Sequence, residues 1–156
     1  MHIEEHVKNY QPQILALTGP PRSRPALVDF AYLICKKNSM LVCGNVVEVL
    51  NLSKYVFFTG VNIELTCWPQ QEKQATRVRA ETLQKSYKHL RENDIKGFCS
   101  LIDNMDLPTG VTAMLEIVGV GKIMPNILLV GYKHDWRVCD SKALNKYFGI
   151  IQLVFD

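Results

Sequence analysis

The feature that most constrains the fold is the alternation of short apolar runs with helical patterns along the chain. The run at residues 39–47 is almost continuously apolar, which is typical of a strand buried on both faces of a parallel sheet. Further apolar runs predict strands at residues 12–17, 96–102 and 125–131. Helical patterns lie at residues 25–37, 69–93, 109–118 and from 140 onward. Because strands and helices alternate, the sequence predicts an α/β fold, a mostly parallel sheet flanked by helices in a Rossmann-like three-layer sandwich.

Apolar residues three and four positions apart predict which side of each helix faces the sheet. In the helix at 25–37 these residues are Leu27, Phe30, Leu33 and Ile34. In the helix at 109–118, which Gly119 is expected to end, they are Val111, Met114, Leu115 and Val118. In the last helix they are Leu144, Tyr147, Phe148, Ile151 and Phe155.

Two segments are predicted to be irregular, and a third to be a long surface helix with a weak apolar stripe (Ala75, Val78, Thr82, Leu83 and Leu90). Residues 1–10 are expected to form a flexible lead-in, and residues 48–69 an irregular excursion that could also be a hairpin. The helix at 69–93 is polar, and its basic residues are interleaved with glutamates. This mixture favours a solvated helix face over a contact with a polyanion.

Length and composition exclude several classes of function. The 156 residues fit one domain, and a net charge of +3 argues against a dedicated nucleic-acid binder. No apolar run approaches the roughly 20 residues that span a bilayer. The five cysteines lack paired spacing, which argues against a disulfide framework or a zinc site and indicates a reducing compartment.

The sequence contains no constellation of catalytic residues. The four histidines are scattered, and no Gly-x-Ser-x-Gly nucleophile elbow is present. We therefore predict that the chain is not an enzyme and that it has neither catalytic residues nor metal ligands. An ATP-hydrolysing stress-protein-like enzyme is the disfavoured reading, because no general base or carboxylate pair is placed to support it.

The ends of the predicted strands are the positions where an α/β sheet holds a ligand. Glycines at two of these ends allow a backbone to approach a ligand closely, and backbone N–H groups near a helix start can hold phosphate. The residues that a nucleotide site would use are Leu17, Thr18, Gly19, Gly44, Gly131 and Tyr132. The alternative is that the glycines merely make tight turns.

Several strings resemble one family of membrane transporters. They lie at Val7–Gln13, Leu17–Pro21, Ser23–Phe30, Met40–Gly44, Lys96–Phe98, Gly119–Asn126 and Val130–Trp136. Together they resemble the start of the cytosolic C-terminal domain of cation-chloride cotransporters, over nearly the whole chain except about residues 47–70. The Asn-Tyr-x-Pro-Gln and Leu-Thr-Gly-x-Pro strings look more like the sodium-dependent branch (Na-K-2Cl or Na-Cl) than the potassium-chloride branch.

The resemblance implies a fold similar to universal stress proteins and a position on the cytoplasmic side of the plasma membrane. It implies that residues 1–156 are the first half of a regulatory domain that supports dimerisation, trafficking and control of ion transport. The implied partners are the second half of that domain, the transmembrane domain and a second copy of the transporter, with no nucleic acid. No cofactor is certain. Some members bind a nucleotide in this half, so ATP or ADP is the candidate ligand, although Gly131–Trp136 replaces the glycine-rich loop of ATP-binding stress proteins.

Overall fold

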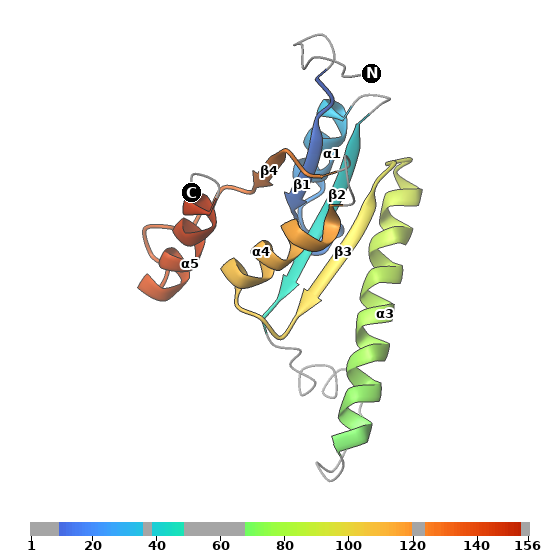
Figure 1. Cartoon of the computed structure of the whole chain (residues 1–156), viewed down its shortest axis with the longest axis vertical. Helices are drawn as coiled ribbons and strands as arrows, with labels where there is room; N and C mark the ends of the chain where they lie inside the picture. The colour runs from blue at the N-terminus through green and yellow to red at the C-terminus, as the bar shows by residue number, and fades with distance from the viewer. Residues whose placement is uncertain (1–9, 36–38, 49–67, 120–123, 154–156) are drawn as a thin grey trace, which may run out of the picture.

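The computed structural model describes residues 10–35, 39–48, 68–119 and 124–153, and in the long helix that begins at residue 68 it describes side chains from residue 75. Its four strands are β1 (Gln13–Leu17), β2 (Met40–Val47), β3 (Phe98–Asp103) and β4 (Ile127–Val130). They form one parallel sheet in the order β3-β2-β1-β4 (Figure 1). The helical elements are η2 (Pro21–Ser23), α1 (Pro25–Ile34), α3 (Trp68–Glu92), α4 (Leu107–Val118) and α5 (Ser141–Gln152). The predicted α/β fold with a parallel sheet is confirmed.

Helices cover both faces of the sheet, so the core has two parts. On one face Ile14 and Ala16 of β1 pack with α1 and with Leu90 of α3. On the other face Leu15 and Leu17 pack with Val111 and Met114 of α4 and Ile150 of α5. Successive strand residues point to opposite faces, so β1 and β2 contribute to both parts. The three-layer arrangement follows directly.

The sequence predicted the wrong inward face for α1. Phe30, Leu33 and Ile34 are 53%, 74% and 37% exposed, whereas Val28 and Ala31 are fully buried. The helix carries a second stripe at helical spacing, in which Tyr32 and Cys35 continue from Val28 and Ala31. The two fully buried residues of this stripe, Val28 and Ala31, are small, which lets the helix approach the strands closely. The size of the residues at the contact, rather than the hydrophobicity of the stripe, therefore selects the buried face.

The predictions for the two later helices had different outcomes. In α4, Val111 and Met114 are buried, and Leu115 and Val118 pack against the same core, as predicted. In α5, the buried residue is Ile150, and Phe148 of the predicted stripe is 49% exposed. Because α5 packs mainly against α4 and joins the core through Ile150, only a narrow part of its surface is buried.

Some predictions concern residues outside those that the structure describes. These are almost all of the lead-in at 1–10, the excursion from residue 49 to 67 and Phe155. Among the described residues, no helix is both long and apolar enough to cross a bilayer.

Candidate functional site

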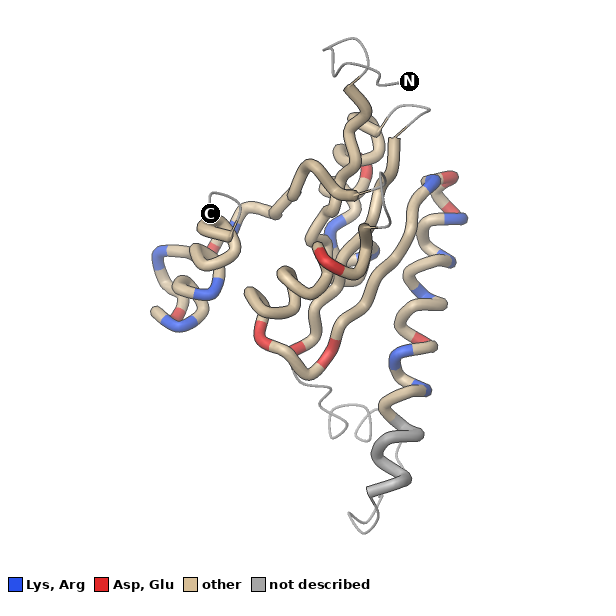
Figure 2. The backbone as a smooth tube through the Cα atoms, in the orientation of Figure 1, with Lys and Arg blue, Asp and Glu red and all other residues tan. Residues whose placement is uncertain are grey.

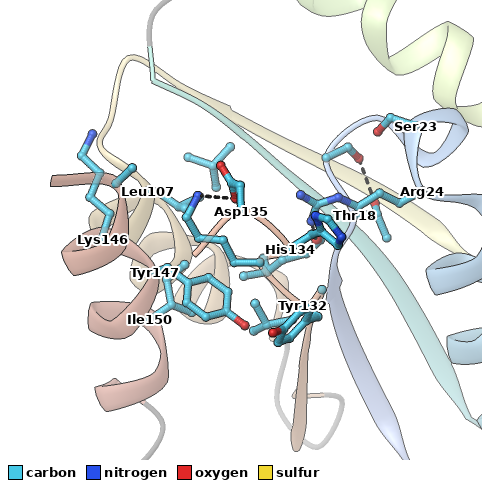
Figure 3. Close-up of a pocket in the computed structure, with 18 of the residues that line it drawn as sticks. Thr18, Ser23, Arg24, Leu107, Tyr132, His134, Asp135, Lys146, Tyr147 and Ile150 are labelled. Carbon is cyan, nitrogen blue, oxygen red and sulfur yellow. Dashed lines mark hydrogen bonds and ion pairs between the residues drawn. The ribbon is translucent and has the colours of Figure 1, made fainter. Parts of the chain in front are cut away.

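The winding of the sheet changes direction beside β1. The chain proceeds from β1 through β2 to β3 on one side, and β4 then pairs with the opposite side of β1. In open α/β sheets, ligands bind beyond the carboxyl ends of the strands at such a switch point. A cleft of about 930 Å³ lies there, bordered by the ends of β1 and β4 and by α5 (Figure 3).

All six residues proposed from the sequence border this one cleft. Leu17, Thr18 and Gly19 come from the end of β1, and Gly131 and Tyr132 follow β4. Gly44 of β2 lies beside Leu17 in the parallel register. The expectation that the ends of the first and fourth strands are neighbours is therefore confirmed.

The turn after β1 is held by its own hydrogen bonds. The Thr18 N–H donates to the Ala16 carbonyl at 2.9 Å, and the Gly19 N–H donates to the Gly44 carbonyl at 3.1 Å. The Thr18 hydroxyl donates to the Gly19 carbonyl at 2.8 Å. Gly19 has φ +63°, a conformation that favours glycine. Both N–H groups already have acceptors, so neither is free to bind a ligand without breaking a hydrogen bond of the turn.

Gly44 also has a packing role. A Cβ at this position lies 2.6 Å from Sδ of Met114 and 3.2 Å from side-chain carbons of Leu15 and Leu17. The absence of a side chain therefore lets Met114 of α4 lie against the sheet. This explains why a glycine occupies the middle of a buried strand, where it is otherwise unfavourable.

Arg24 is one of several cleft residues that sequence reasoning missed, together with Lys133, Lys142 and Lys146. The Nη1 atom of Arg24 donates to the Leu17 carbonyl at 3.4 Å, at the end of β1. A Cβ at Gly131 lies 2.9 Å from the same Nη1, so the glycine after β4 leaves room for the guanidinium. The only signal for Arg24 in the sequence is a basic residue directly before the Pro25 that begins α1.

The loop after β4 adds an exposed aromatic ring and an ion pair. Tyr132 is 75% exposed at the cleft, and Lys133 Nζ lies 3.0 Å from Oδ1 of Asp135 (Figure 3). The hydrogen bond from Lys133 lowers the pKa of the Asp135 carboxyl. The same bond raises the pKa of the Lys133 amine. Both groups remain charged at neutral pH.

The charges that border the cleft favour an anionic ligand. The cations are Arg24, Lys133, Lys142 and Lys146, and the carboxylates are Glu48, Asp135 and Asp140. Lys146 is paired with Glu48 at 2.6 Å, and Lys133 with Asp135. Neither Arg24 nor Lys142 forms an ion pair with another described residue. These two cations can face a phosphate or carboxylate without breaking an existing pair.

The arrangement is suited to binding an anionic ligand. Tyr132 offers a ring for stacking, and Arg24 offers a guanidinium for bidentate bonds to an anion. Over the part of the chain that the structure describes, no three His, Cys, Asp or Glu side chains gather to hold a metal ion.

Comparison with known proteins identifies the family. Residues 24–156 match the model of solute carrier family 12. The chain belongs to this family. It is 34% identical over 152 residues to a bumetanide-sensitive sodium-(potassium)-chloride cotransporter of Manduca sexta. It is 37% identical over 155 residues to solute carrier family 12 member 3 of Pseudopleuronectes americanus, and 34% identical over 154 residues to the Mus musculus protein of that name.

These alignments cover nearly all of this chain and a small part of each relative. The Manduca sexta alignment spans 97% of the chain and 12% of the cotransporter. The resemblance to cation-chloride cotransporters is thereby confirmed, and it extends through residues 47–70, where the quoted strings had left a gap. The chain, a member of solute carrier family 12, therefore spans only about an eighth of the length of these relatives.

Proposed function

We propose that the chain is a non-catalytic regulatory and assembly domain of an electroneutral sodium-(potassium-)chloride cotransporter. In this proposal it lies on the cytoplasmic side of the membrane and supports dimerisation, trafficking and control of ion transport. The observation that carries the proposal is the match of almost the whole chain to one segment of a named cotransporter. The α/β architecture, with a binding cleft and no reactive constellation among its described residues, is compatible with a control function.

A chimera tests this proposal on the chain itself. Deleting the matching segment from the Manduca sexta cotransporter should abolish its dimers or reduce its delivery to the cell surface. Inserting residues 1–156 in its place should restore both, because the fold and the family are shared. Crosslinking measures the dimer, surface biotinylation the delivery, and chloride-dependent sodium uptake the transport.

The matched control is the same chimera with Ile14→Asp, which places a charge at a fully buried position and should prevent folding of the inserted segment. This variant should behave like the deletion. Normal assembly, delivery and uptake in the deleted protein would contradict an assembly or regulatory function.

A second candidate function is nucleotide sensing in the switch-point cleft. It is favoured by one observation: six residues chosen from the sequence border a single cleft that also contains Arg24 and Lys142. In this proposal the cations bind the phosphates of ATP or ADP, and Tyr132 contacts the base. Ligand binding and assembly are compatible, because a ligand can shift the population of an assembled state.

The Arg24→Ala variant should bind ATP about tenfold more weakly than the unchanged chain, because a charge-assisted hydrogen bond is lost. Isothermal calorimetry with ATP, ADP and AMP measures this. Arg137→Ala is the matched control, since Arg137 stacks on Trp136, with its guanidinium carbon 5.0 Å from the ring centroid, and does not border the cleft. The absence of heat with all three nucleotides at millimolar concentration would exclude nucleotide sensing and leave the assembly function untouched.

A further inference from the structure

The short turn η2 ends in an exposed serine between two arginines. Ser23 is the last residue of the turn, Arg22 precedes it and Arg24 follows it, and all three residues are exposed. Ser23 and Arg24 border the switch-point cleft and come from the same loop beside β1 (Figure 3). Arg22 borders a separate groove between η2 and α3. The two arginines therefore face different surfaces, and only Arg24 shares the cleft with the serine.

The hydroxyl of Ser23 can be esterified without leaving the backbone of the turn unpaired. Its Oγ donates to the Pro20 carbonyl at 2.7 Å, and the Ser23 N–H donates to the same carbonyl at 2.9 Å. The Arg24 N–H donates to the Pro21 carbonyl at 3.3 Å. When Oγ loses its proton to a modification, the Pro20 carbonyl keeps its backbone donor.

The cations near Ser23 are available to a new negative charge. Neither Arg22 nor Arg24 forms an ion pair with another residue that the structure describes. Across the groove from Arg22, α3 adds Lys85, and Lys and Arg recur along this helix (Figure 2). A dianion on Ser23 therefore enters a basic part of the surface.

The neighbouring carboxylates do not oppose such a charge strongly. No Asp or Glu lies in the first turn of η2 or of α1. Of the carboxylates that border the cleft, Glu48 and Asp135 are paired with lysines. The third, Asp140, precedes α5, which lies across the cleft from Ser23 (Figure 3).

The guanidinium of Arg24 can accept a phosphate with little loss of existing bonds. Its Nη1 donates to the Leu17 carbonyl at 3.4 Å, which is long for a hydrogen bond of this type. A guanidinium has five N–H donors in a planar fork that matches two oxygens of a phosphate. Arg24 is therefore placed at the cleft wall and keeps donors for a phosphate on the residue before it.

We propose that Ser23 is a phosphorylation site for a kinase that selects basic residues on both sides of the acceptor serine, and that the resulting phosphate pairs with Arg24 at the wall of the cleft. In the reaction, Oγ of Ser23 attacks the γ-phosphorus of ATP. The bond from that phosphorus to the β–γ bridging oxygen breaks, ADP leaves, and a base of the kinase takes the hydroxyl proton.

The phosphate neutralises one of the two cleft cations that lack an ion pair among the described residues, and it leaves Lys142 as the other. This site does not depend on nucleotide binding.

Phosphate incorporation tests the site on the 156-residue chain. The chain is incubated with ATP and a kinase of the protein kinase C type, which selects serines flanked by basic residues, and mass spectrometry counts and locates the phosphates. Ser23 should be phosphorylated, and Arg22→Ala should slow the reaction about tenfold, because a recognised charge is lost. Ser23→Ala should abolish this phosphate. The matched control Ser141→Ala, which removes an exposed serine beside Asp140, should retain it. No phosphate at Ser23 in the unchanged chain would overturn the proposal.

Phosphoserine placed at residue 23 during translation tests the partner of the phosphate. Phosphorus NMR follows its titration. A guanidinium beside the phosphate stabilises the dianion, so the midpoint should lie about half a pH unit or more lower in the unchanged chain than in Arg24→Gln. The matched control Arg22→Gln removes the same charge at the other surface and should move the midpoint much less. Circular dichroism verifies that each variant is folded. An unchanged midpoint in Arg24→Gln, or equal changes in the two variants, would overturn the pairing with Arg24.

Discussion

The Gly44→Ala variant should lower the free energy of unfolding by about 1–3 kcal/mol, the usual cost of overpacking a core. The new Cβ is placed 2.6 Å from Sδ of Met114 and 3.2 Å from Leu15 and Leu17, so several side chains must shift. Met114→Ala should cost about 2–5 kcal/mol, because Met114 is fully buried and its removal leaves a cavity. Urea unfolding followed by circular dichroism measures both.

The double variant Gly44→Ala/Met114→Ala distinguishes this packing account from a general intolerance of change in β2. Its destabilisation should be smaller than the two single effects added together, because removing the Met114 side chain opens the space that the new methyl group needs. Gly149→Ala is the matched control. Its Cβ is 3.5 Å from Pro108, an ordinary contact, and Ala is the better helix former, so this variant should gain up to about 1 kcal/mol. Strict additivity of the Gly44 and Met114 variants would contradict the close contact between them.

Stability should fall steeply at alkaline pH because of the buried thiol of Cys43. Burial, with a smaller contribution from Cys99, raises the pKa of Cys43 to about 12. In the unfolded chain the thiol loses its proton near pH 9, whereas the folded chain retains it to much higher pH. Unfolding therefore releases a proton in this range, and the free energy of unfolding should decrease by up to about 1.4 kcal/mol per pH unit as pH rises from about 9. Below about pH 9 the contribution of this thiol is fully present.

Urea unfolding at a series of pH values from about 8 to about 11 measures this slope. The Cys43→Ala variant should be somewhat less stable at neutral pH but should lose less stability on going to alkaline pH than the unchanged chain. Val42→Ala is the matched control, because it removes apolar atoms from the neighbouring buried position of β2 and adds no titration. The Val42→Ala variant should lower the free energy of unfolding by a similar amount at every pH. If the free energy of unfolding of Cys43→Ala fell with pH in parallel with that of the unchanged chain, the Cys43 thiol would not be the source of the loss of stability at alkaline pH.

The sheet could be predicted from the sequence because its strands are short, apolar and separated by turn residues. β2 is buried along most of its length, and its continuous run Met40–Val47 is typical of a central strand in an α/β domain. The placement of Leu17, Thr18, Gly131 and Tyr132 at one cleft followed from topology alone, since β1 and β4 are neighbours at the switch point.

What the sequence did not reveal depends on contacts between distant residues. The buried face of α1 is decided by how closely the helix approaches the sheet, so Phe30 and Leu33 are exposed although they are the larger apolar residues. Arg24 joins the cleft because Gly131, far along the chain, leaves it room. The ion pair between Lys146 and Glu48 joins residues 98 positions apart, and no local sequence pattern predicts it.

The alternation along β1 has a mechanical consequence. Ile14 and Ala16 point into one half of the interior, and Leu15 and Leu17 into the other. A shift of this strand by one residue would exchange all four between the two halves, so its register is strongly specified. Since Thr18 and Gly19 continue directly from the strand, the backbone at the mouth of the cleft is anchored in both halves of the interior.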